Sequence, residues 1–191
     1  MVQSSLNILG SGAVAAFTAG SKIENVFTQA FVALGTTMST YNAQNIGARQ
    51  LDRVRKGFRS ADVIGCIYAV AVGFILFFVG KYFAYLFISD NAETVIPMVD
   101  IYLQCVGMFM IPLYVVNCYR NGFQGMGYGL LPMLSGVAEL IGRGVMAVVA
   151  AHEKSYRMAC MASPFAWIVA TALLFVLYFY VMKDMKKKLC L

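Results

Sequence analysis

Charged residues are scarce in this 191-residue chain, and their scarcity sets its class. Only 13% of the residues are charged and 60% are hydrophobic, with a mean hydropathy of +0.72. A soluble domain is closer to half apolar and a quarter charged. The composition therefore excludes an ordinary soluble protein and predicts an integral membrane protein. The apolar runs are long and continuous rather than alternating, which favours membrane helices over a barrel.

Several groups of residues that carry chemistry are also missing. The single histidine is His152, and the five cysteines form no CxxC pair, so the sequence offers no metal-ligand cluster and no disulfide framework. It shows no nucleophile–base pair and no phosphate-binding loop, so we expect no enzyme activity and no cofactor. Aromatic residues do not alternate with the basic ones, which argues against a nucleic-acid partner. The partner that the composition predicts is the lipid bilayer.

Turn signals and charge clusters divide the chain into six predicted helices within one domain. They lie at residues 1–19, 21–48, 60–88, 97–125, 130–151 and 161–182, with a cytoplasmic basic loop at 49–59 and a tail at 183–191. About 20 apolar residues cross a bilayer, and each predicted helix reaches about that length. The first helix is the most polar and begins abruptly, as expected for a start placed inside a longer gene. The predicted fold class is an all-α polytopic membrane protein.

The distribution of basic residues predicts the topology. Most of the 15 lysine and arginine residues lie in the loop at 49–59 and in the tail at 183–191. Arg49, Arg53 and Lys56 share a helical face, so a short interfacial helix is the alternative to a loop that is only a topology signal. Basic residues concentrate on the cytoplasmic side of membrane proteins. We therefore expect six crossings of the plasma membrane, with both ends of the chain in the cytoplasm.

The second predicted helix carries a stripe of uncharged polar side chains. Gln29, Thr36, Thr40 and Gln44 follow the spacing that places residues on one helical face. This stripe has two interpretations. The stripe faces a water-filled cavity, because lipid cannot hydrogen-bond it, or it joins the helix to its neighbours. On the first interpretation these four residues are cavity-lining candidates.

Ionisable residues within the predicted helices are the second set of candidates. Glu139 and Arg143 lie four residues apart near the middle of one helix and therefore share a face. Intramembrane charges are costly and are functional by default. We interpret the two residues as a structural ion pair, and a cation or proton role for Glu139 is the alternative. Asp100 lies near the outer end of the fourth helix and is the third ion-coupling candidate.

The fourth helix, at 97–125, has features of a mobile element, and the alternative is that its proline is only structural, as prolines in membrane helices often are. Pro112 falls at its middle and is expected to kink it. Asn117 and Asn121 share a face at its inner end, beside Arg120, and are further cavity-lining candidates.

Four segments resemble the multidrug and toxic compound extrusion (MATE) transporters, in the order and spacing of that family. They read AAFTAGSKIENV at 15–26, QNIGARQLDRVRKGFR at 44–59, YRNGFQGMGYGLLPMLSGVAELIGR at 119–143 and MASPFAW at 161–167. The resemblance covers nearly the whole chain. Members of the family have two six-helix lobes, and this chain is similar to the second lobe, with its first helix clipped.

The resemblance implies a function for the chain as half of an antiporter. Such a protein exports drug-like or organic cations in exchange for sodium or protons, by alternating access around a cavity between the lobes. The lobe then requires the missing N-terminal lobe or a second half-chain. Glu139 and Arg143 match a recurrent E-x-x-x-R of the family, and Asp100 is the only acid on the equivalent of its tenth helix. The alternatives are a truncated fragment that does not transport, and a flippase for lipid-linked precursors from the same superfamily.

Overall fold

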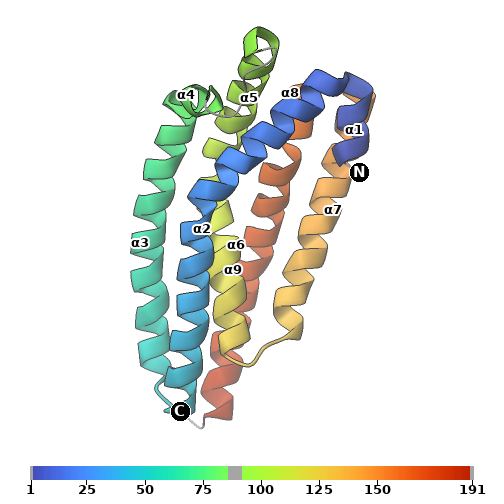
Figure 1. The fold of residues 1–191 in the computed structure, drawn as a ribbon. Coiled ribbons are helices and arrows are strands. Elements are labelled where there is room, and N and C mark those ends of the chain that lie inside the picture. Colours follow the sequence, from blue (N-terminus) through green and yellow to red (C-terminus); the bar gives the residue numbers. More distant parts are fainter. Residues whose placement is uncertain (1, 86–91, 190–191) are drawn as a thin grey trace.

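The computed structural model of the chain describes residues 2–85 and 92–189, and in these ranges its regular structure is helical. Long helices stand side by side, and short ones lie at one end of the bundle (Figure 1). In chain order they are α1 Val2–Leu9, α2 Ser11–Gly47, α3 Leu51–Phe78, α4 Gly80–Ala84, α5 Ala92–Gly107, α6 Met110–Gly125, α7 Leu130–Glu153, α8 Tyr156–Cys160 and α9 Ala162–Lys188. The prediction of an all-α membrane protein is confirmed.

The first helix break lies at Gly10, which corrects the predicted boundary at residue 20. Gly10 has φ 101°, a conformation that favours glycine, and it separates the eight residues of α1 from the 37 residues of α2. The predicted helix at 1–19 therefore does not exist as one unit. At 1.5 Å per residue, α2 is about 55 Å long and exceeds the hydrocarbon thickness of a bilayer.

The predicted basic loop at 49–59 is mostly helical. A tight turn at Arg49, with φ 56°, links α2 to α3, and α3 begins at Leu51. The basic residues from Arg53 onward therefore lie on the first turns of α3. Helix α3 ends at Phe78 and α4 follows, so the helix predicted at 60–88 begins and ends earlier than expected. Its last three residues, 86–88, lie outside the described residues.

The predicted kink at Pro112 is present, but its break lies a few residues earlier. Helices α5 and α6 are bent by 56° at residues Met108 and Phe109. A proline cannot donate a backbone hydrogen bond to the carbonyl four residues before it, and its ring clashes with that carbonyl. For Pro112 this is the carbonyl of Met108, which explains the position of the break. Helix α5 also begins at Ala92, five residues before the predicted start.

The last helices lie where the sequence predicts them, but their lengths differ from the predicted ones. Helix α7 covers the predicted range 130–151 and ends at Glu153 with Lys154 in a left-handed conformation, φ 46°. The short helix α8 precedes α9, and α9 continues through the predicted tail to Lys188. The tail at 183–191 is therefore a helical extension up to Lys188.

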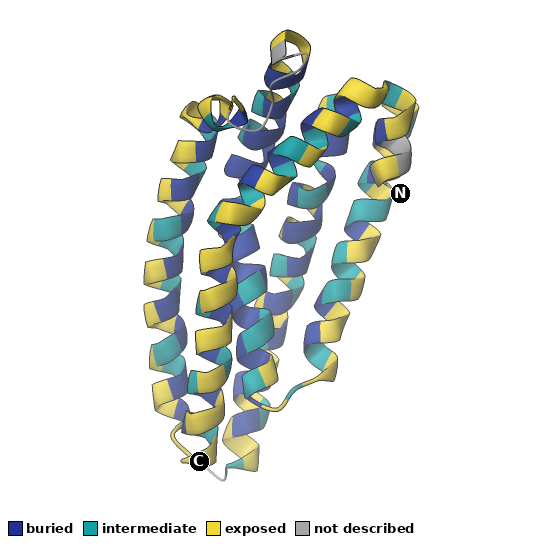
Figure 2. Cartoon of the chain, in the orientation of Figure 1, coloured by how far each residue is buried: buried dark blue, intermediate teal, exposed yellow. Residues whose placement is uncertain are grey.

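The core lies where α2 packs against α5 and α6, and where α7 packs against α9. Large aromatic side chains fill it, with Phe31, Phe58, Tyr114 and Phe123 all less than 2% exposed. The outward faces are also apolar, as Ile67 of α3 and Phe179 of α9 illustrate, which suits a surface in contact with lipid. Figure 2 shows this division, with buried residues on the facing sides of the helices and exposed ones outside.

Length and composition support fewer crossings than the predicted six. Within the described residues, three helical stretches are long and apolar enough to cross a membrane, Leu51–Phe78, Leu130–Glu153 and Tyr156–Lys188, and a fourth is added if α5 and α6 count as one bent span. Helix α1 is too short to cross, and the polar side chains of α2 lower its hydropathy. Six crossings therefore stay a prediction.

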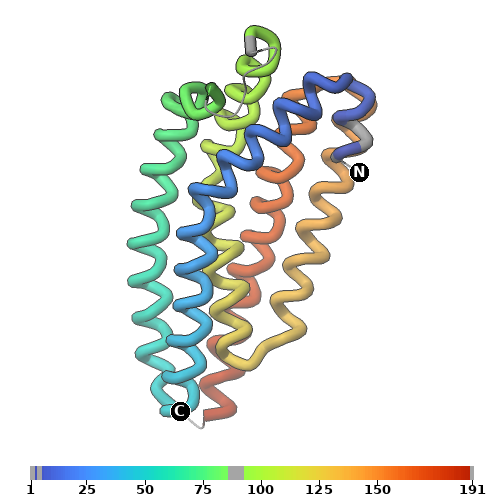
Figure 3. The backbone as a smooth tube through the Cα atoms, in the orientation of Figure 1, coloured from blue at the N-terminus to red at the C-terminus, as the bar shows by residue number. Residues whose placement is uncertain are grey.

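A polar contact fastens α9 to the turn between α6 and α7. The hydroxyl of Tyr128 donates to the carboxylate of Asp184, and Lys188 forms an ion pair with the same carboxylate at 2.8 Å. Burial and the hydrogen bond to Asp184 raise the pKa of Tyr128 to about 12, so the hydroxyl keeps its proton at neutral pH. Figure 3 shows that this turn, the α2–α3 turn and the C-terminal end of α9 lie at the same end of the bundle.

Candidate functional site

The predicted polar stripe of α2 faces away from the rest of the chain. Gln29, Thr36, Thr40 and Gln44 are all exposed, whereas Phe31 and Met38 on the opposite face are buried. The stripe therefore does not join α2 to its neighbours within this chain. An open groove of about 660 Å³ runs along it, lined by Ala33, Thr36, Thr37, Thr40, Tyr41 and Gln44.

The threonine hydroxyls of this groove bond to the backbone of their own helix. Thr36 donates to the carbonyl of Val32 at 2.9 Å, and Thr37 donates to that of Ala33 at 2.9 Å. Their donors are therefore satisfied without a neighbouring helix. Their oxygens and the amides of Gln29 and Gln44 present a neutral polar surface to whatever covers the groove.

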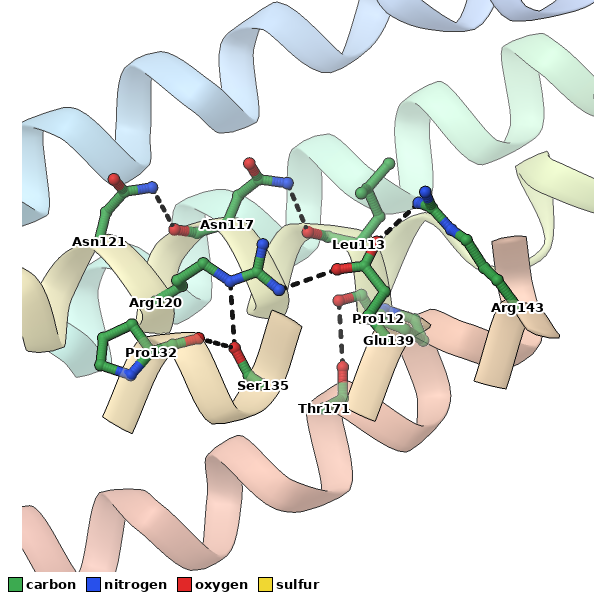
Figure 4. A network of polar contacts seen from close by, with 10 residues as sticks. All are labelled: Pro112, Leu113, Asn117, Arg120, Asn121, Pro132, Ser135, Glu139, Arg143 and Thr171. Carbon is green, nitrogen blue, oxygen red and sulfur yellow. Dashed lines mark hydrogen bonds and ion pairs between the residues drawn. The ribbon is translucent and has the colours of Figure 1, made fainter. Parts of the chain in front are cut away.

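The other cavity-lining candidates, Asn117 and Asn121, lie between α6 and α2. Both are partly buried, and a Cβ added at Gly35 of α2 would lie 2.8 Å from the backbone oxygen of Asn117 and from the amide nitrogen of Asn121. Their amides donate to the carbonyls of Leu113 and Asn117 at 3.0 and 2.8 Å. Figure 4 shows both side chains on the face of α6 away from Ser135. The structure thus separates these two residues from the groove on α2.

An ionic network joins α6 to α7. Glu139 contacts Arg143 at 2.6 Å and also Arg120 of α6 at 2.8 Å (Figure 4). Arg120 donates a further hydrogen bond to Ser135 at 3.1 Å, and the hydroxyl of Ser135 donates to the carbonyl of Pro132 at 2.7 Å. The Glu139 side chain is 15% exposed, so the pair is well shielded. Glu139 and Arg143 form the predicted pair, and Arg120 adds a second cation.

The third ion-coupling candidate, Asp100, stands apart from this network. It is partly buried on α5 and accepts a hydrogen bond at 2.9 Å from Gln104, one turn later on the same helix. The structure therefore does not bring Asp100 into contact with Glu139 or Arg143.

Two acids inside the bundle were not predicted as candidates. The carboxylate of Asp62 on α3 accepts hydrogen bonds from the hydroxyls of two buried tyrosines, Tyr114 at 3.0 Å and Tyr119 at 2.9 Å. Glu24 of α2 accepts a hydrogen bond from the hydroxyl of Tyr102 of α5. One feature of the sequence could have identified them: each acid lies within a predicted helix, on the face that also carries apolar residues.

No arrangement of metal ligands appears in the described part of the chain. Across residues 2–85 and 92–189, no three side chains among His, Cys, Asp and Glu gather in a way that could hold a metal ion.

The long apolar helices and their apolar outer faces define a multi-pass helical membrane protein. A comparison with protein-family models matches the MatE family over residues 1–149. The chain belongs to the MatE family, whose members are transporters rather than enzymes. No curated protein matches the chain. No solved structure matches it either.

Proposed function

We propose that the chain forms one lobe of a secondary antiporter that exports drug-like or organic cations in exchange for sodium or protons. The lobe acts together with an N-terminal lobe or with a second copy of the chain, and the substrate cavity lies between the two. The lobes alternate between states open to either side of the membrane. The coupling ion drives this alternation because it binds the two states with different affinity.

The exposed polar face of α2 carries this proposal. Glutamine amides at Gln29 and Gln44 are costly against lipid, so a second lobe or a water-filled space is the better cover for them. The groove beside them has the size of a drug-like ligand site. Tyr41 adds an aromatic ring to its wall, which suits a cationic amphiphile.

The charge of the groove distinguishes the proposal from a flippase for lipid-linked precursors. Such precursors carry phosphate groups, which basic residues bind. None of the six residues that line the groove is charged. The neutral lining favours a neutral or cationic substrate, and the flippase stays the second candidate.

The basic end of the bundle supports a cytoplasmic C-terminus. Arg53 and Lys56 on α3 and Lys183, Lys186 and Lys187 on α9 are exposed, and both segments lie at the same end (Figure 1). Thiol labelling in intact cells tests this orientation, with a cysteine-free chain as background. A cysteine at Lys154, at the opposite end, should react with an impermeant reagent, and one at Lys186 should react only after lysis.

Transport in proteoliposomes tests the function. The chain is reconstituted alone and with a co-expressed N-terminal lobe, and efflux of a fluorescent organic cation is followed under a sodium or a proton gradient. The double variant Gln29→Leu/Gln44→Leu should abolish gradient-driven efflux while folded yield stays normal. A control pair on the lipid-facing side of α3, Ile64→Leu/Ile67→Leu, should transport normally.

Two results would contradict the proposal. Absence of gradient-driven transport in both reconstitutions, for a panel of organic cations, would favour the non-transporting fragment. Movement of a phosphate-bearing lipid analogue across the bilayer, at a rate that the organic cations do not reduce, would favour the flippase.

A further inference from the structure

An apolar cavity lies between α3 and the bent pair of helices α5 and α6. Its volume is about 310 Å³, and its lining consists of apolar side chains and two glycines, with Val70, Phe74 and Phe77 on α3 and Met108 and Ile111 across from them. Ligand pockets in proteins measure about 300–1,000 Å³. The cavity is therefore large enough for a chain-like apolar group, and its side chains offer no partner to a charged one.

Small residues at the contact between the helices create the hollow. A Cβ at Gly73 of α3 would lie 2.7 Å from the backbone oxygen of Gly107 on α5, so the two backbones touch there. The bend of 56° between α5 and α6 follows directly, at Met108 and Phe109. Larger side chains line the hollow on both sides of the glycines, among them Phe74 from α3 and Met108 from the bend. The hollow is the space between these two walls, and its shape depends on the bend.

The cavity opens to the outside of the bundle. Its floor is buried, since Ala69 and Met110 are each 1% exposed. Its walls stand free, since Phe74 is 61% exposed and Met108 is 54% exposed. Within a membrane, exposed apolar side chains of this kind suit contact with lipid. The cavity thus continues the lipid-facing surface of α3 inward.

The cavity faces away from α2 and its polar groove. Tyr68 of α3 marks the side toward α2, because its hydroxyl donates to the backbone oxygen of Phe27 at 2.9 Å. At 100° per residue, Phe77 in the cavity wall is turned by about 180° from Tyr68. A second lobe over the groove therefore lies on the other side of α3, which stands at the edge of the bundle (Figure 1). The bilayer is the better occupant for the cavity side.

The extent of the cavity along α3 matches one layer of acyl chains. From Val70 to Lys81, at the start of α4, the helical rise is about 17 Å at 1.5 Å per residue. This is about half of the ~30 Å hydrocarbon thickness of a bilayer. Lys81 and Tyr82 are exposed, and the amine of Lys81 lies 5.2 Å from the centre of the Tyr82 ring. Such a pair of residues is typical of the membrane–water interface, where lipid phosphates lie.

We propose that this cavity binds one acyl chain of a phospholipid whose phosphate group meets Lys81. The site goes beyond the proposed transport function and does not depend on it. In a bilayer the chain is already out of water, so its gain over bulk lipid is the van der Waals packing against both walls. Because the shape of the hollow depends on the bend, the bound chain favours the bent arrangement of α5 and α6.

Tryptophan quenching by a brominated lipid tests the site in the full chain. Trp167→Phe removes the only native tryptophan, and Phe74→Trp in this background is the cavity reporter. Phe179→Trp, the same change at an exposed position of α9, is the control reporter. Each protein in detergent micelles is titrated with phosphatidylglycerol that carries bromine on its acyl chains. The cavity reporter should be half-quenched at a ratio of lipid to protein roughly tenfold lower than the control reporter requires.

Further variants show whether the cavity itself causes this difference. Val70→Phe/Ile111→Phe adds bulk to both walls and should bring the two reporters to the same half-quenching ratio. Val145→Phe/Ile141→Phe makes the same changes on the exposed face of α7 and should leave the difference intact. Lys81→Gln should raise the ratio that the cavity reporter requires, because the phosphate loses its cation.

The acyl-chain site is overturned if both reporters are half-quenched at the same ratio, or if the filled cavity leaves their difference unchanged. An unchanged ratio in Lys81→Gln overturns the phosphate contact. If Phe74→Trp does not fold, Met108→Trp reports from the opposite wall and must give the same result.

Other occupants of the cavity give different results. An organic cation that relieves the quenching of the cavity reporter would assign the cavity to a solute and overturn the lipid site. Self-association that shields the cavity reporter from lipid would assign it to a second copy of the chain, with the same consequence. None of these measurements uses an ion gradient, so the lipid site and the proposed antiport fail separately.

Discussion

Replacement of Glu139 by glutamine removes the carboxylate that two guanidinium groups contact. The ion pairs measure 2.8 Å to Arg120 and 2.6 Å to Arg143, and the Glu139 side chain is only 15% exposed. A glutamine of nearly the same shape keeps one acceptor oxygen but no charge. Both arginines then face each other across the α6–α7 contact without the compensating anion.

The expected cost is about 3 kcal/mol of unfolding free energy. Removal of one partner from a buried ion pair costs roughly 3–5 kcal/mol. The Arg120 and Arg143 side chains are 29% and 42% exposed, so partial solvation places the value at the lower end of this range. Arg143→Gln should cost less, because Glu139 then keeps Arg120 as its partner.

Reversible unfolding in mixed detergent micelles measures these differences, with Glu153→Gln as the control. A Glu139→Gln protein no less stable than the control would refute the structural interpretation of the network. If such a protein also lost only ion-coupled efflux in proteoliposomes, Glu139 would be a coupling residue instead. Recovery of stability in Arg120→Gln/Glu139→Gln, relative to Glu139→Gln alone, would identify the unpaired Arg120 as the source of the cost.

Sequence periodicity predicted those parts of the site that lie within one helix. The exposed stripe with Gln29 and Thr36 and the pair of Glu139 with Arg143 follow from helical spacing alone. The contact of Arg120 with Glu139 joins two helices, and that of Tyr102 with Glu24 joins residues 78 apart. Spacing along one helix contains no information about such pairs, so the prediction missed them.

Helix ends were predicted less well, for a related reason. Gly10 and Gly20 are both glycines in a polar stretch, and the sequence alone does not show which one ends a helix. Gly10 adopts a positive φ, whereas Gly20 stays helical and makes room for the ring of Tyr102. At 49–59 the basic residues mark the membrane side, and lysine and arginine are also good helix formers, so α3 begins within the predicted loop.

Two further substitutions test contacts that hold the bundle together. Gly20→Ala should lower the free energy of unfolding by about 1–3 kcal/mol, because the added Cβ overlaps the ring of Tyr102. Gly136→Ala is the control, since no atom lies within 4 Å of its added Cβ, and it should change the free energy of unfolding by less than about 1 kcal/mol. Thermal unfolding measures both. The contact of Tyr128 with Asp184 should depend on pH at alkaline values. Because folding raises the pKa of Tyr128 from 10.0 to about 12, its stabilising contribution is complete below pH 10 and is lost as the pH rises through 12. The difference in tyrosinate absorbance between the wild type and Tyr128→Phe should therefore appear near pH 12. A difference near pH 10 would mean that the α6–α7 turn is not held to α9 by this contact.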